Sequence, residues 1–242
     1  MNMDVIRLAA GMCQRLVTTV YPPCCVLCGA PGCNGMDICA ACYRHLPWID
    51  QACSQCAIPI AAEPAGALKC GQCLRKPPAF DYSLSLFRYQ DDAIKLIQQL
   101  KFNEKLANSR LLGSMLAAVI TDSTTALPDC IVPVPLHNKR LRQRGFNQST
   151  ELGRVAGKAC KIPLSSHAVM RVRDTRSQTG LDKRQRHNNI RGAFEIRQAL
   201  DAEHVAILDD VVTTTSTVNE LARLLKKAGV RRVDVWSIAR AV

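Results

Sequence analysis

The chain has 242 residues, with 32 lysines and arginines against 20 aspartates and glutamates, so its formal net charge is +12. This length can bury one large core, or a small core and a medium one. The sequence contains no run of 18 apolar residues, which excludes a membrane-spanning helix. The excess positive charge favours phosphate-bearing ligands, either pyrophosphate groups or a nucleic-acid backbone.

Residues 1–21 predict a short amphipathic helix that ends before Pro22 and Pro23. Arg7 and Arg15 interrupt its apolar stretch, and the small-residue cleavage site of a secretory signal is missing. We therefore expect a cytoplasmic protein.

Residues 22–78 form a cysteine-rich module. Eleven of the thirteen cysteines precede Leu74, and eight of them form four C-x-x-C pairs. One pair can place two thiolates on one metal ion, so two pairs complete a tetrahedral zinc site. We predict two structural Zn2+ sites, most simply with the pairs combined in sequence order. The predicted ligands are Cys25, Cys28, Cys39 and Cys42 for one ion and Cys53, Cys56, Cys70 and Cys73 for the other.

Other arrangements of these cysteines stay open. The pairs could interleave, and Cys24 or Cys33 could replace a neighbour as ligand. A disulfide scaffold competes with zinc, but the chain shows no export signal and a cytosol keeps thiols reduced. A redox role suits one C-x-x-C pair and not four. Because the module has few large apolar residues, metal binding would supply most of its folding energy. Cys13, Cys130 and Cys160 are interpreted as small core residues.

Residues 79–242 predict a second, α/β domain. The pattern indicates a strand at 82–89, helices at 91–102 and 105–120, and a short buried strand at 130–134. Strands that alternate with helices are typical of a parallel sheet.

Basic residues follow the strand at 130–134. Lys139 and Arg140 are candidates for contact with pyrophosphate, because open α/β sheets bind ligands at the carboxyl ends of their strands. Arg142 and Arg144 could serve the same ligand or a DNA phosphate. We interpret the segment as a loop that leads into a helix at 146–159.

A second basic stretch, residues 171–191, carries seven basic residues against two acidic ones and no sustained apolar period. Loops of this length inside a compact domain are usually functional or disordered. Its candidates for contact with nucleic acid are Arg171, Arg173, Lys183 and Arg184.

The most informative run is residues 205–217. A buried strand ends at Asp209 and Asp210, and a hydroxyl-rich turn and a helix at 218–228 follow. Hydroxyls and free N–H groups at a helix N-terminus favour an anion, while the paired carboxylates can accept hydrogen bonds from sugar hydroxyls. Simple helix capping is the alternative, but it leaves the carboxylate pair unexplained. The candidate phosphate ligands are Thr213, Thr214, Thr215, Ser216 and Thr217. A final strand at 233–238 completes a βαβ unit.

This run resembles the binding fingerprint for 5-phosphoribosyl 1-pyrophosphate (PRPP) of type I phosphoribosyltransferases. The resemblance implies that Asp209 and Asp210 bind the ribose hydroxyls and serve catalysis, that the turn holds the 5-phosphate, and that Mg2+ accompanies PRPP. It also implies a lid at 171–191. The family usually has a small residue, most often glycine, where this chain has Thr215. A β-branched residue would be strained there if the turn needs a positive φ.

Motifs along nearly the whole chain are similar to those of the ComF family. They are V-P-V-P-L, R-L-R-x-R-G-F-N-Q-S, I-x-x-L-K-F at 97–102, and the C-x-x-C pairs that close with C-L-R-K-P-P. The resemblance implies a type I phosphoribosyltransferase-like domain behind the zinc module. It further implies a role in natural transformation, where the protein handles incoming single-stranded DNA with partners such as a helicase or recombination mediators.

Two functions therefore stay open. In one, the protein transfers the phosphoribosyl group to an unidentified nucleobase or other acceptor. In the other, it binds PRPP without turnover and its basic surface binds DNA. The sequence shows no base-recognition hood with a stacking aromatic residue, and we interpret Trp236 as a core residue.

Overall fold

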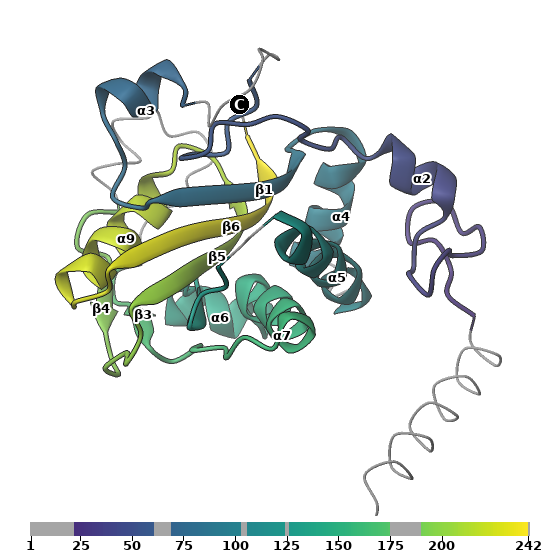
Figure 1. Ribbon diagram of the computed structural model, residues 1–242. Helices are drawn as coiled ribbons and strands as arrows, with labels where there is room; N and C mark the ends of the chain where they lie inside the picture. Colours follow the sequence, from purple (N-terminus) through teal and green to yellow (C-terminus); the bar gives the residue numbers. More distant parts are fainter. Residues whose placement is uncertain (1–21, 61–68, 103–105, 124–125, 175–189, 242) are drawn as a thin grey trace, which may run out of the picture. The chain divides into compact units, whose positions relative to one another are not determined.

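The chain divides into two compact units, Met1–Leu46 and Pro47–Val242. Figure 1 shows the computed structural model of the chain. It describes residues 22–60, 69–102, 106–123, 126–174 and 190–241. The amphipathic helix expected at 1–21 lies outside the described residues.

The described part of the first unit is built from short turns around cysteines. Isolated bridges join Cys24 to Pro31 and Cys33 to Met36, and one short helix follows, α2 (Ala40–His45). Among the described residues of this unit, Ile38 and Leu46 are the only large apolar side chains that are buried, so a bound metal would supply much of the folding energy.

The second unit contains a four-stranded sheet whose strands all run parallel, in the order β1-β6-β5-β2. Apolar runs of strand length form its two central strands, which are buried along nearly their whole length. The strands are β1 (Tyr82–Arg88), β2 (Cys130–Pro133), β5 (His204–Val212) and β6 (Arg232–Arg240). The sheet confirms the α/β class expected from the sequence.

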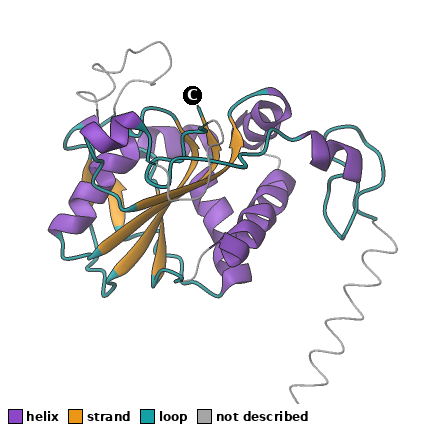
Figure 2. Ribbon diagram, turned by 45° about the horizontal axis from the view of Figure 1, so that its top comes forward, coloured by secondary structure: helices purple, strands orange, loops and turns teal. Residues whose placement is uncertain are grey.

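Helices cover both faces of this sheet (Figure 2). One face packs against α5 and α7, and Gly153 of α7 lies so close to Leu164, Leu208 and Ile131 that a side chain would not fit there. The other face packs against α9, because residues such as Ile207 alternate with Leu208 along β5. The helices are α4 (Asp91–Phe102), which packs on α5, α5 (Leu106–Ser123), α7 (Gln148–Cys160) and α9 (Ser216–Lys227).

Both edges of the sheet are covered. Beside β1, the N–H of Ile49 donates to the carbonyl of Leu86, and the N–H of Arg88 donates to the carbonyl of Pro47, at 2.9 and 2.8 Å. Beside β2, Ile131 donates to Pro163 at 2.8 Å and accepts from Ser165 at 2.8 Å. The hydrogen-bonding groups of the outer strands are therefore engaged at these points.

Four short elements of the second unit were not expected from the sequence. The segment interpreted as a basic loop contains a helix, α6 (Asn138–Arg144), which His137 caps at its start and Gly145, at φ 77°, ends. Two three-residue strands, β3 (Val169–Arg171) and β4 (Phe194–Ile196), form an antiparallel pair. A five-residue helix, α3 (Gly71–Arg75), follows Cys70.

The division between the two compact units, after Leu46, falls inside the cysteine-rich segment 22–78. Cys53, Cys56 and Cys73 belong to the same hydrophobic core as β5 and α9. The second group of cysteines therefore folds with the sheet, and only the first group lies in the unit that ends at Leu46. None of the helices in the described part of the chain has the length and apolar character that a bilayer crossing requires.

Candidate functional site

The first cluster of four cysteines consists of Cys25, Cys28, Cys39 and Cys42. Their sulfur atoms lie within 4.8 Å of one another, and Sγ of Cys28 lies 3.7 Å from Sγ of Cys39. A tetrahedral zinc ion with bonds of about 2.3 Å to sulfur places its ligands about 3.8 Å apart. The geometry therefore fits a structural zinc site.

The second cluster of four cysteines consists of Cys53, Cys56, Cys70 and Cys73, again within 4.8 Å of one another. Sγ of Cys56 lies 3.7 Å from Sγ of Cys70, and the N–H of Cys70 donates to Sγ of Cys53 at 3.2 Å. All but Cys70 are buried. The grouping in sequence order, with two clusters that fit two zinc ions, agrees with the prediction.

The acidity of the second cluster also suits a divalent cation. Burial would raise the pKa of Cys53, but N–H groups of Cys70, Cys56 and Gln55 donate to its sulfur and lower that pKa to about 7. Burial raises the pKa of Cys56 to about 11 and, together with the neighbouring thiols, raises that of Cys73. Four thiolates can share this space only around a cation, which displaces their protons when it binds.

The remaining cysteines of the described residues lie outside both clusters. Neither Cys24 nor Cys33 replaces a cluster ligand among those residues. Cys130 is buried in the core, as expected, and Cys160 is half-buried. Cys13 lies outside the described part of the chain.

The two acidic residues predicted to bind ribose lie at the carboxyl-terminal half of β5. Nζ of Lys101, at the end of α4, lies 2.9 Å from Oδ2 of Asp210. The hydroxyl of Ser149, in the first turn of α7, donates to Oδ1 of Asp209 at 3.3 Å. The strand thus brings the carboxylate pair against the ends of two helices, and the ion pair with Asp210 brings Lys101 into the candidate site.

Asp209 lies in a strongly perturbed environment. Burial and the negative charge of Asp210 raise the pKa of Asp209 to about 7, while Lys101 and the Ser149 hydroxyl oppose that rise. The buried site therefore favours the neutral form of Asp209 more than water does. A carboxylate held in this state is typical of a binding or catalytic site.

Arginines surround the carboxylate pair. Burial lowers the pKa of Arg144, and the charge of Asp210 opposes that shift. Burial and the charge of Arg140 lower the pKa of Arg171, and the charge of Asp209 opposes it. These guanidinium groups are therefore within electrostatic reach of the aspartates. Arg171 is only 7% exposed, and its guanidinium carbon lies 5.8 Å from the centre of the Phe194 ring.

Other predicted cations lie further out. Lys139 is exposed on α6, and its Nζ lies 3.8 Å from Oδ2 of Asp174. Arg142, on the same helix, and Arg173, after β3, are exposed. Lys183 and Arg184, with the rest of the expected lid at 175–189, lie outside the described residues.

Residues 213–217, here called the hydroxyl loop, comprise the turn after β5 and the first two residues of α9. The hydroxyls of Thr214 and Ser216 lie 3.0 Å apart, and the hydroxyl of Thr215 donates to the carbonyl of Thr214 at 2.6 Å. Thr215 has φ 62° and ψ −4°, which is left-handed backbone. The positive φ considered from the sequence is therefore present, and a β-branched residue occupies it with strain.

Replacing Thr215 with Gly is expected to raise the free energy of unfolding by about 1 kcal/mol. Release of the left-handed strain outweighs the extra chain entropy of glycine. Thr215→Asn should stabilise less, and Thr215→Val should destabilise, since it keeps the strain and loses the hydroxyl. Chemical denaturation measures all three variants. Equal stability of Gly and Val variants would contradict the strain.

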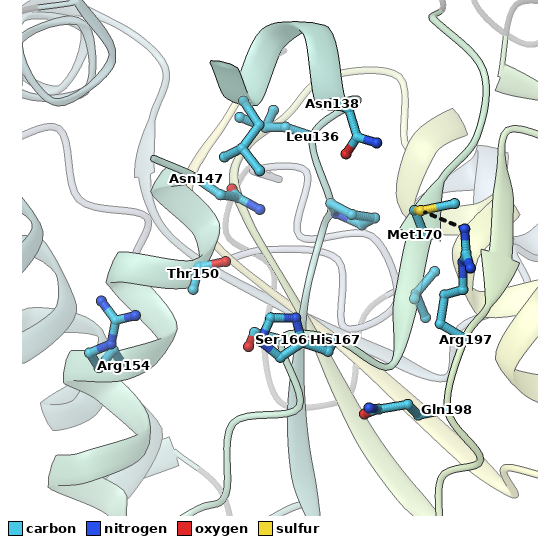
Figure 3. Close-up of a pocket in the computed structure, with 13 residues that line it drawn as sticks. Leu136, Asn138, Asn147, Thr150, Arg154, Ser166, His167, Met170, Arg197 and Gln198 are labelled. Atoms are coloured by element: carbon cyan, nitrogen blue, oxygen red, sulfur yellow. Dashed lines mark hydrogen bonds between the residues drawn. The ribbon is translucent and has the colours of Figure 1, made fainter. Parts of the chain in front are cut away.

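A pocket of about 790 Å3 lies beside α6 and the start of α7 (Figure 3). Its polar lining combines amides and hydroxyls with cationic groups, and the guanidinium of Arg197 approaches Sδ of Met170 at 3.2 Å. No carboxylate occurs among the described residues that line it. Its polar and cationic lining residues are Asn138, Asn147, Gln198, Thr150, Ser166, His167, Arg154 and Arg197.

Comparison with known proteins extends these observations. A family model described as a double zinc ribbon domain matches residues 16–74. The chain is 37% identical over 226 residues to the DNA utilization protein YhgH of Salmonella typhimurium. The aligned region covers 91% of this chain and 98% of that protein. It is 35% identical over 182 residues to competence protein F of Haemophilus influenzae, over 72% of this chain and 80% of that protein.

Among solved structures, the purine phosphoribosyltransferase from Pyrococcus horikoshii matches 56% of this chain and 86% of its own, with 17% identity and a TM-score of 0.32. With so low an identity, this match says nothing about the chemistry of the site, which depends on the residues of this chain. The two cysteine clusters, the parallel sheet and the double zinc ribbon match confirm the predicted α/β class, with a zinc-ribbon-like module before a parallel-sheet domain. With 37% identity over nine tenths of its length, the chain belongs to the ComF family, which includes the DNA utilization protein YhgH and competence protein F.

Proposed function

We propose that this protein binds PRPP together with Mg2+ and handles single-stranded DNA during DNA uptake. The observation that carries the first part is the carboxylate pair of Asp209 and Asp210, held between Lys101 and Ser149 immediately before the hydroxyl loop. The names of its relatives, which speak of DNA utilization and competence, support the second part.

The chemistry of the site matches the parts of PRPP. Asp209 and Asp210 can accept hydrogen bonds from the vicinal ribose hydroxyls. The hydroxyl loop and the free N–H groups of α9 suit the 5-phosphate. Arg140 and Arg144 suit the pyrophosphate, because planar guanidinium groups bind phosphate oxygens in pairs.

Mg2+ would neutralise part of the charge on the pyrophosphate. It prefers oxygen ligands and retains several water molecules, and the carboxylates of β5 can accept hydrogen bonds from such a water shell. In the chain itself, Lys101 offsets part of the charge of Asp210 and so opposes the repulsion between the carboxylates that raises the pKa of Asp209.

Titration calorimetry with PRPP tests the binding, with and without Mg2+. Ribose 5-phosphate and pyrophosphate serve as separate component ligands. We expect PRPP to bind more tightly than either component, because it fills both the hydroxyl loop and the arginine side of the site. Failure of PRPP to bind in the presence of Mg2+ would refute the assignment.

Transfer of the phosphoribosyl group is a second candidate function, which the pocket beside α6 favours. Its amides and hydroxyls could hold a base or sugar, and His167, Arg154 and Arg197 could hold a phosphate. Release of pyrophosphate from PRPP in the presence of nucleobases or single-stranded oligonucleotides would establish turnover, whereas binding without release would leave the site as a PRPP sensor.

Arg142→Ala is expected to weaken binding to single-stranded DNA without affecting PRPP. Arg142 is exposed on α6, and loss of one phosphate contact should reduce the slope of log affinity against log salt by about 0.7. Arg144→Ala should weaken both ligands, since its guanidinium is in electrostatic reach of Asp210.

Fluorescence anisotropy with a labelled oligonucleotide at several salt concentrations measures this difference. Arg231→Ala is the matched control, because Arg231 is 77% exposed and precedes β6 at the opposite end of the sheet. An unchanged salt slope in Arg142→Ala would place the DNA on another surface.

A further inference from the structure

Arg240, the last residue of β6, joins the second cysteine cluster to the hydroxyl loop. Its side chain is 5% exposed, and its Nε donates to the carbonyl of Cys56 at 2.9 Å. Its Nη1 donates to the carbonyls of Val212, at 3.0 Å, and of Thr213. One buried guanidinium thus holds a zinc ligand's backbone and the first residue of the loop at the same time.

A second connection runs through the other end of the loop. The side-chain oxygen of Asn219, in the first turn of α9, accepts from the N–H of Ala79 at 2.6 Å. The N–H of Asn219 donates to the carbonyl of Thr215 at 2.8 Å. Ala79 follows Cys73 by six residues, so the chain that leaves the second cluster also positions the strained residue of the loop.

Charge links the cluster to Arg240 as well. Four thiolates around a dication leave a net charge of −2, and the sulfurs of Cys56, Cys70 and Cys73 lie within electrostatic reach of the Arg240 guanidinium. A buried cation is stable only beside such a charge or with its donors satisfied. The metal-loaded cluster therefore favours the position of Arg240 that engages the loop.

We propose that Arg240 is a positioning residue through which metal in the second cluster and an anion in the hydroxyl loop stabilise one another. This inference rests on the proposed binding of PRPP. Coupling between two binding sites is reciprocal, and typical values correspond to 5- to 150-fold changes in affinity. Metal in the cluster should raise the affinity for PRPP at least fivefold. Bound PRPP should raise the affinity of the cluster for the metal by the same factor.

The equilibrium partition of zinc between the protein and a chromogenic chelator tests the coupling. The measurement uses the full chain with Cys28→Ser, so that only the second cluster holds zinc. We expect PRPP with Mg2+ to raise the zinc affinity of this cluster at least fivefold. In the Arg240→Met variant this factor should fall to about one. Arg232→Met, at the other end of β6, is the matched control and should keep the factor.

Arg240→Lys covers the case in which the Met variant fails to fold. Lysine keeps the buried charge but can reach fewer carbonyls at once, so the factor should fall below that of the wild type while the protein stays folded. An unchanged factor in either folded Arg240 variant would overturn the proposal, and a reduced factor in Arg232→Met would show that Arg240 has no specific part.

Hydrogen exchange separates a failure of this coupling from a failure of PRPP binding. Without any ligand, removal of zinc from the second cluster should raise exchange at the amides of residues 213–219. The Arg240→Met variant should show this raised exchange even with zinc bound, and removal of zinc should raise it no further. If PRPP does not bind but exchange follows this pattern, the positioning role stands and the proposed ligand is wrong. If PRPP binds and exchange is unaffected by zinc, the positioning role is wrong.

Discussion

Cys73→Ser is expected to remove one zinc ion per chain and to lower the free energy of unfolding of the second unit by at least about 3 kcal/mol. Cys73 is 4% exposed and belongs to the core that also contains β5 and α9. Loss of its thiolate leaves three ligands for the ion, and the sheet loses a packed neighbour. Elemental analysis and denaturation followed by tryptophan fluorescence measure the two effects.

Cys28→Ser is the matched comparison. It should also remove one zinc ion, but Cys28 is an exposed member of the first cluster, in the unit that ends at Leu46. Both tryptophans, Trp48 and Trp236, lie in the second unit, so the fluorescence transition should stay where it is. An equal loss of stability in both variants would contradict the separate placement of the two clusters.

The double variant Asp209→Asn/Asp210→Asn is expected to abolish PRPP binding. The two single variants are expected to change the free energy of unfolding in opposite directions. Each removes a charged acceptor for a ribose hydroxyl, so calorimetry should show at least a 100-fold loss of affinity together. Asp210→Asn should also destabilise the protein, because Lys101 loses its partner while it is mostly buried.

Asp209→Asn should instead stabilise the unliganded protein at pH 8, by about 1 kcal/mol or more. The folded chain raises the pKa of Asp209 from 3.8 to about 7, so between these values it binds more protons than the unfolded chain. The contribution of Asp209 to stability therefore falls as pH rises from about 4 to about 7, and it is restored as pH falls.

Thermal unfolding at pH 5 and pH 8 measures this sign. The advantage of Asp209→Asn should be smaller at pH 5. Asp92→Asn serves as a control, because Asp92 pairs with the exposed Lys95 at a helix start and should change neither PRPP binding nor the pH profile of stability. Stabilisation by Asp209→Asn that does not depend on pH would contradict the raised pKa.

The sequence predicts those parts of the fold whose signals are local. A stretch of about a dozen residues is enough to predict β5 from its apolar run, α4 from its helical spacing and each zinc-binding turn from its cysteine pair. Helix α6 gives no such signal, because Leu141 is its only apolar residue and its cap is a histidine. Strands β3 and β4 are three residues long, too short for any alternation to show.

The site is predictable only in part for the same reason. Asp209 and Asp210 stand out in the sequence, but Lys101 precedes them by more than a hundred residues, and only the folded sheet brings the three together. The position of the domain boundary is another long-range property. Cysteine spacing predicts a zinc cluster, but it does not reveal that Cys53 packs in the core of the sheet.

The covered edges of the sheet limit how other proteins can bind. A partner that adds a strand needs a row of free N–H and carbonyl groups. Residues 47–49 occupy that row along β1, and residues 163–165 occupy it along β2. On β2 the next outward position is Pro133, which has no N–H to offer. At these positions a protein partner of the sheet would have to recognise side chains on the helices and loops, where specificity depends on sequence and not on backbone pairing.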